Sequence, residues 1–179
     1  MARLKKTVVL VGMMGAGKTA VGTQLARQLG VPFVDSDDEI EKAAARSIPE
    51  IFADHGEAFF RQKESQVLSR LLLGAPCVLS TGGGAFLAES NRRAISDHGV
   101  SVWLKAELDL LWQRVRHKSS RPLLRTANPR QTLADLLAAR EGIYAKAAIT
   151  VDSLPGVPVD QMAARVRDAL SRHPDIMEP

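Results

Sequence analysis

The feature that most constrains this chain is a glycine-rich stretch, GMMGAGKT, which directly follows the short apolar run Thr7–Val11. Gly12, four further residues, and then Gly17, Lys18 and Thr19 complete the G-x-x-x-x-G-K-[ST] pattern between an expected strand and an expected helix. In that context backbone N–H groups can surround a phosphate, and the helix N-terminus adds partial positive charge. Lys18 would reach the β- and γ-phosphates, and the Thr19 hydroxyl would bind Mg²⁺. The pattern predicts that the chain binds ATP or GTP.

The rest of the chain alternates between apolar β-branched runs and helical patterns, which is typical of βαβ units around a buried parallel sheet. We therefore expect an α/β fold. The expected strands are Thr7–Val11, Pro32–Asp35, Cys77–Ser80, Val100–Leu104 and Ala148–Val151.

Three local patterns predict finer features. Ser47 and Glu50 have the spacing of a capping box, so they should begin a short helix that Gly56 ends. A longer helix should follow over residues 58–73. The final residues, 174–179, resemble a frayed tail.

Length and composition favour one domain, residues 1–179, of an ordinary cytoplasmic protein. The net charge of +4 is a mild bias without a block of like charges, so we expect no nucleic-acid partner. The apolar run after the basic start is too short for a signal sequence or a membrane span. The single cysteine, Cys77, cannot form an internal disulfide and should be a buried, inert thiol. We expect a monomer.

Two carboxylates follow the second expected strand, at the edge of a parallel sheet where ligands bind. Strand alternation would put Asp35 and Asp37 on one side and Ser36 on the other. One carboxylate could then hold Mg²⁺ while the other meets an attacking hydroxyl. Asp38 and Glu39 are better explained as charges that complement a helix dipole.

Two arginines fall in or beside apolar helical stripes, which is costly unless they meet an anion. Arg140 lies in the stripe that contains Leu133 and Tyr144, and Arg61 borders a stripe that Glu64 interrupts. Arg61 and Glu64 could form an ordinary intrahelical pair, or Glu64 could hold the Arg61 fork for a substrate carboxylate. Spacing alone leaves both readings open.

Two further segments would face the same edge of the sheet. Gly82, Gly83 and Gly84 follow the third expected strand and permit close approach of backbone to a ligand. The polar stretch 116–131, RHKSSRPLLRTANPRQ, is a candidate mobile lid, from which one arginine would close on the ATP phosphates.

Taken together, the ordered motifs make the chain resemble the shikimate kinase family over roughly Thr7 to Leu170. They are GMMGAGKT, DSD, SIPEIF, GE-x-x-FR-x-x-E, TGGGA, RPLL and R-x-x-x-Y. The resemblance implies a three-layer P-loop kinase fold with a five-stranded parallel sheet flanked by helices, a lid at 116–131 and a substrate-binding segment at about 36–64. It also implies transfer of the ATP γ-phosphoryl group to the 3-hydroxyl of shikimate, with Mg²⁺, on the route to chorismate and aromatic amino acids.

Carried over by position, the resemblance implies roles for individual residues. Lys18, Asp37 and Arg121 would be catalytic, and Thr19 and Asp35 would serve the metal. ATP would be bound by Gly12, Gly15, Ala16, Gly17, Lys18, Thr19, Ala20, Arg114, Arg121 and Pro155. Shikimate would be bound by Asp37, Arg61, Gly82, Gly83, Gly84 and Arg140, with Glu64 supporting Arg61.

One departure from the family pattern is Arg46, where glycine is frequent, and it would stiffen the turn before Ser47. A gluconate kinase shares the P-loop fold but is not expected to show the TGGGA and RPLL motifs. A non-catalytic, nucleotide-sensing P-loop module is disfavoured by the intact set of Lys18, Asp35, Asp37 and Arg121.

Overall fold

The computed structural model describes residues 2–117 and 125–179, and its centre is a five-stranded parallel sheet in the order β3-β4-β2-β5-β6. Every residue of β2 and β4 is buried, because parallel strands are covered by helices on both faces. The five expected strands are confirmed, with limits that shift by no more than one residue. They are β2 (Thr7–Val11), β3 (Phe33–Asp35), β4 (Val78–Ser80), β5 (Gly99–Lys105) and β6 (Ile149–Asp152).

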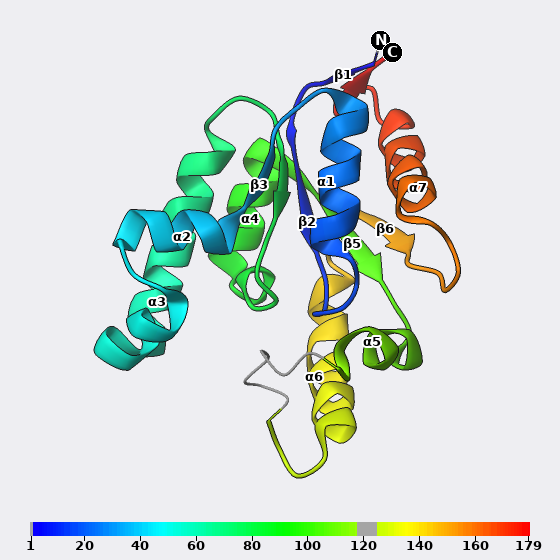
Figure 1. Ribbon diagram of the computed structural model, residues 1–179. Coiled ribbons are helices and arrows are strands. Elements are labelled where there is room, and N and C mark those ends of the chain that lie inside the picture. Colours follow the sequence, from blue (N-terminus) through cyan, green and yellow to red (C-terminus); the bar gives the residue numbers. More distant parts are fainter. Residues whose placement is uncertain (1, 118–124) are drawn as a thin grey trace.

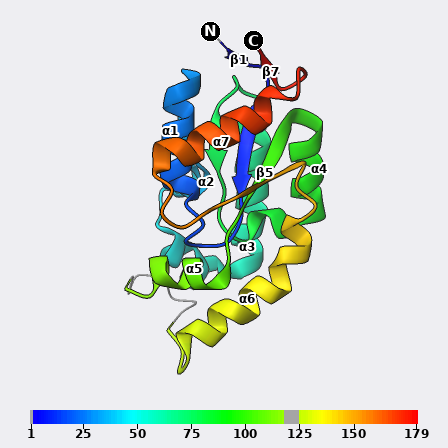
Figure 2. The same cartoon turned by 90° about the vertical axis from the view of Figure 1, so that its right-hand side faces the viewer.

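Helices cover both faces of this sheet, which gives the expected three-layer α/β architecture. Figure 2 shows α1 and α4 on opposite sides of β2 and β5, and α1 packs closely against α7. A short 3₁₀ turn, η1 (Ala85–Leu87), follows β4. The helices are α1 (Lys18–Leu29), α2 (Ser36–Ala44), α3 (Ile48–Leu72), α4 (Glu89–His98), α5 (Leu108–Val115), α6 (Pro129–Tyr144) and α7 (Val159–Ser171).

The capping box at the start of α3 is confirmed. The Ser47 hydroxyl accepts from the Glu50 N–H at 3.3 Å, and the Glu50 carboxylate accepts from the Ser47 N–H at 3.2 Å. Gly56 then adopts φ 83° and ψ 176°, so the chain bends sharply between a short first part and a longer second part of α3. The two helices expected from the sequence are therefore the two arms of one kinked element.

The turn between α2 and α3 differs from the expectation about Arg46. The residue in the left-handed conformation is Ala45, with φ 52°, so glycine would be favoured there and not at Arg46. Arg46 instead forms an exposed ion pair with Asp54 of α3. The position of this turn at which glycine would relieve strain is therefore Ala45, one residue before Arg46.

The expectation of a frayed C-terminal tail is wrong. Strand β7 (Met177–Glu178) pairs antiparallel with β1 (Arg3–Leu4), and the two ends of the chain lie side by side in Figure 1. Ile176 and Met177 are buried, and the Lys5 ammonium donates to the Pro174 carbonyl at 3.0 Å. No local pattern predicts this pairing, because its partners are separated by almost the whole chain.

The carboxyl ends of β2, β3 and β4 open into one cleft of about 800 Å³. This is the edge at which open α/β sheets bind ligands. Within residues 2–117 and 125–179, none of the helices has the length and apolar character that a membrane span requires.

Candidate active site

The glycine-rich loop joins β2 to α1, and its backbone is pressed against α5. Gly15 has φ 84°, and a Cβ there would stand 2.8 Å from the Val115 side chain, so only glycine fits both the conformation and the space. The Lys18 ammonium curls back over the loop, where it donates to the Gly12 carbonyl and, at 3.4 Å, to that of Met13. Of the expected nucleotide-binding residues, Gly15, Gly17, Lys18, Thr19 and Ala20 line the cleft.

Gly12 and Ala16 do not line the cleft, although both were expected to bind nucleotide. Ala16 is 1% exposed, and a Cβ on Gly12 would stand 2.9 Å from the Leu104 carbonyl oxygen. Both residues therefore pack the loop against the interior of the protein and do not face the cleft.

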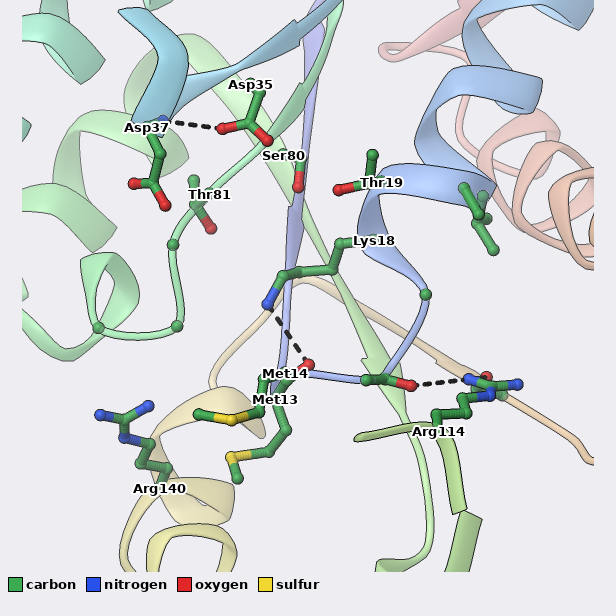
Figure 3. A pocket seen from close by; sticks show the side chains of 18 of the residues that line it. Met13, Met14, Lys18, Thr19, Asp35, Asp37, Ser80, Thr81, Arg114 and Arg140 are labelled. Atoms are coloured by element: carbon green, nitrogen blue, oxygen red, sulfur yellow. Dashed lines mark hydrogen bonds between the residues drawn. The ribbon is translucent and has the colours of Figure 1, made fainter. Parts of the chain in front are cut away.

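Asp35 and Asp37 both line the cleft (Figure 3), but strand alternation is not the reason. Strand β3 ends at Asp35 and helix α2 begins at Ser36, so Asp37 lies in the first turn of a helix. The Asp35 carboxylate caps this helix by accepting from the Asp37 N–H at 2.8 Å. This hydrogen bond fixes the position of the Asp35 carboxylate relative to the backbone of Asp37.

These carboxyl groups are held in an environment that resists their ionisation. Burial, followed by repulsion from Asp35 and Glu64, raises the pKa of Asp37 to about 6. Burial also raises the pKa of Asp35. The Lys18 ammonium opposes both shifts. The acidic side of the cleft thus lies next to the phosphate-binding side.

Arg61 and Glu64 form an ion pair on the inner face of α3. The Arg61 Nη1 donates to the Glu64 Oε1 at 2.9 Å; the Glu64 side chain is 2% exposed and that of Arg61 is 37% exposed. Burial raises the pKa of Glu64 even though Arg61 opposes the shift. The geometry fits both an ordinary intrahelical pair and a Glu64 that holds Arg61 for a substrate carboxylate. The same contact within α3 also keeps the guanidinium at the cleft.

The three glycines after β4 each face a different functional side chain. A Cβ on Gly82 would stand 3.0 Å from the Asp37 Oδ1, and one on Gly83 would stand 3.0 Å from the Arg140 Nη1. A Cβ on Gly84 would stand 2.6 Å from both terminal nitrogens of Arg61. The glycines are therefore required for close approach, and one loop gathers side chains from α2, α3 and α6.

Arg114 lies between the glycine-rich loop and the segment after β6. Its Nη1 donates to the Gly15 carbonyl at 2.9 Å and to the Ser153 hydroxyl at 3.2 Å. Ser153 in turn donates to the Ala16 carbonyl at 3.2 Å and is 4% exposed. Pro155, expected at the nucleotide, is exposed and does not line the cleft, whereas Ser153 and Val157 do.

Sequence reasoning missed several residues of the cleft. Met13 and Met14 line the cleft, as do Ser80 and Thr81 at the end of β4, whose hydroxyl groups are drawn with the two carboxylates in Figure 3. The sequence signal for these residues was their position, within the glycine-rich stretch for the two methionines and at the end of β4 for the two hydroxyl groups. The expected lid residue Arg121 lies outside the described residues, and Pro129, Arg130 and Gln131 of the expected lid belong to α6.

Known proteins resemble this chain in sequence and in fold. A model of the shikimate kinase family matches residues 14–171. A shikimate kinase of Cereibacter sphaeroides is 70% identical over 178 residues, which cover 99% of this chain and 89% of the relative. A structure of Acinetobacter baumannii shikimate kinase in complex with shikimate superposes with a TM-score of 0.86 at 40% identity, covering 94% of each chain. A gluconokinase from Sinorhizobium meliloti shares only the fold, with a TM-score of 0.63 at 18% identity over 95% of this chain and 94% of that one. The chain belongs to the shikimate kinase family.

Proposed function

We propose that the chain transfers the γ-phosphoryl group of ATP to the 3-hydroxyl of shikimate, giving shikimate 3-phosphate and ADP, in the synthesis of chorismate and aromatic amino acids. The observation that carries this proposal is the triple-glycine loop, which a carboxylate (Asp37) and two arginines (Arg140 and Arg61) approach closely in the same cleft as the phosphate-binding loop. A hydroxylated ring that bears a carboxylate matches this arrangement. The solved relative that is 40% identical contains shikimate.

In the proposed reaction, Arg61 and Arg140 bind the substrate carboxylate with their guanidinium forks. Arg140 of α6 approaches Gly83 and Arg61 of α3 approaches Gly84, and Glu64 fixes the direction of Arg61. Asp37 then faces the reacting hydroxyl, which it orients and from which it accepts the proton. Lys18 balances the charge that develops on the transferring phosphoryl group.

Mg²⁺ is the metal that the available donors fit. The Thr19 hydroxyl and the Asp35 carboxylate face the same space (Figure 3), and both are hard oxygen donors. In the described part of the chain, no group of three or more His, Cys, Asp or Glu residues could form a closed metal cage. An ion held by few protein ligands and by substrate phosphates suits Mg²⁺, which would neutralise charge between the β- and γ-phosphates.

The proposal also includes the nucleotide base and the lid. We expect Arg114 to flank the nucleotide base, and its hydrogen bonds to the Gly15 carbonyl, in the glycine-rich loop, and to the Ser153 hydroxyl beside it support this role. Arg121 as a lid residue on ATP, and the mobility of the lid, stay predictions from the sequence. A monomer in the cytoplasm also stays a prediction, with which the buried free thiol of Cys77 is compatible.

A turnover assay tests the proposal. The chain with ATP and Mg²⁺ should release ADP rapidly with shikimate and only at the background rate with gluconate or AMP. Rapid turnover with gluconate would support the alternative sugar-acid kinase. ATP binding without turnover on any of the three acceptors would support a nucleotide-sensing module instead.

A further inference from the structure

Tyr144 ends the R-x-x-x-Y motif, and the proposed reaction assigns it no role. It is the last residue of α6, it is completely buried, and it is the only tyrosine in the chain. Its hydroxyl donates to the Gly83 carbonyl oxygen at 2.6 Å. A buried tyrosine hydroxyl needs a hydrogen-bond acceptor, and this one finds it in the middle of the triple-glycine loop.

Arg140 lies one helical turn before Tyr144, on the same face of α6. A Cβ on Gly83 would stand 3.0 Å from the Arg140 Nη1 and 3.9 Å from the Tyr144 hydroxyl oxygen. Burial raises the pKa of Tyr144, while the charge of Arg140 and a hydrogen bond with it oppose that shift. Two side chains from successive turns of one helix therefore lie against Gly83, and the Tyr144 hydroxyl forms a hydrogen bond with its carbonyl oxygen.

The ring of Tyr144 also reaches toward the base of the glycine-rich loop. It packs against the Trp103 ring with centroids 6.0 Å apart. A Cβ on Gly12 would stand 3.3 Å from the Trp103 ring. Tyr144 thus contacts the triple-glycine loop directly and reaches the phosphate-binding loop through one aromatic neighbour.

We propose that Tyr144 is a positioning residue for the acceptor substrate, which fixes Gly83 relative to α6 so that Arg140 stands where the acceptor carboxylate binds. This rests on the proposed function, in which Arg140 and the triple-glycine loop hold the acceptor. Without the hydroxyl, the Gly83 carbonyl loses its hydrogen-bond donor. The triple-glycine loop is then no longer tied to α6, the helix that carries Arg140.

The loss should be local, because other contacts hold the rest of this segment. Thr81 donates to the Leu10 carbonyl at 3.1 Å, Asn91 to the Ala85 carbonyl at 2.9 Å, and Arg92 to the Phe86 carbonyl at 2.8 Å. The ends of the loop therefore stay attached to β2 and α4 when the middle contact is removed.

The test is Tyr144→Phe, which removes one oxygen and keeps the ring. We expect the KM for shikimate to rise by roughly 3- to 10-fold, as for the loss of one buried hydrogen bond, with the KM for ATP and kcat within about twofold of wild type. The control is Val166→Ala in α7, a fully buried residue that does not line the cleft. It should lower the melting temperature but leave both KM values unchanged.

A second readout uses the single tyrosine. With ¹³C at the tyrosine Cζ, the protein gives one resonance, which should move on addition of shikimate and hardly at all on addition of ADP. An unchanged KM for shikimate in Tyr144→Phe, an equal rise in both KM values, or the same rise in Val166→Ala would each overturn the positioning role. A wild-type protein that does not phosphorylate shikimate would instead refute the proposed function.

Discussion

Gly84→Ala is the change whose effect the structure defines most sharply. Gly84 has φ −98° and ψ −8°, which alanine adopts without strain, so the variant should fold. The added methyl carbon would, however, stand 2.6 Å from both terminal nitrogens of Arg61, whereas ordinary contact begins at 3.4 Å. The guanidinium, which is the flexible end of the Arg61 side chain, must therefore retreat by about 0.8 Å from its position beside Glu64.

The size of the effect follows from this displacement. A binding group must be held within about 0.5 Å of its productive position, so the Arg61 fork would no longer meet the substrate carboxylate correctly. Losing a hydrogen bond to a charged group costs about 1.5–3 kcal/mol, which is roughly a 10- to 150-fold rise in the Kd for shikimate. Because Gly84 does not contact the glycine-rich loop, the Kd for ADP should stay the same.

Calorimetric titration with shikimate and, separately, with ADP measures both values. Gly142→Ala is the matched control, because it makes the same chemical change in α6, and a Cβ there meets no described atom within 4 Å. It should leave shikimate binding intact and stabilise the helix by about 0.5–1 kcal/mol. If Gly84→Ala bound shikimate as wild type does, Arg61 would not contact the carboxylate and the reasoning would be refuted.

Three other perturbations test separate parts of the structure. Asp37→Asn should reduce kcat by on the order of 10²- to 10⁴-fold while the Kd for ATP changes little; normal turnover with weak ATP binding would reassign Asp37 to the nucleotide. Ala45→Gly should raise the free energy of unfolding by about 0.5 kcal/mol, since it relieves a left-handed alanine at a smaller entropic cost; a lower urea midpoint would contradict the strain. Met177→Ala should lower that free energy by about 2 kcal/mol, because the side chain is buried in the terminal pair of strands, whereas a neutral result would indicate a frayed tail.

The chemistry of the site could be predicted from the sequence because it depends on short-range patterns. GMMGAGKT places its glycines, Lys18 and Thr19 within one strand-loop-helix unit, so spacing alone defined the phosphate-binding loop. The charged residues in apolar stripes, Glu64 and Arg140, were also visible, since an inward charge interrupts a helical period. The strand alternation applied to Asp35 and Asp37 failed, because Asp35 caps a helix and the period changes from two to 3.6 at that residue.

Contacts between distant segments could be decided only by the tertiary structure. That Gly82, Gly83 and Gly84 face Asp37, Arg140 and Arg61 in turn depends on how α2, α3 and α6 pack around β4, and no local pattern encodes this. The same holds for the hydrogen bond from Tyr144 to Gly83, and for the pairing of the two chain ends, whose partners are 61 and more than 170 residues apart. The sequence by itself determined which chemical groups are present and the local element that carries each. Only the packed fold determined which groups meet, because burial and close approach are properties of the whole core.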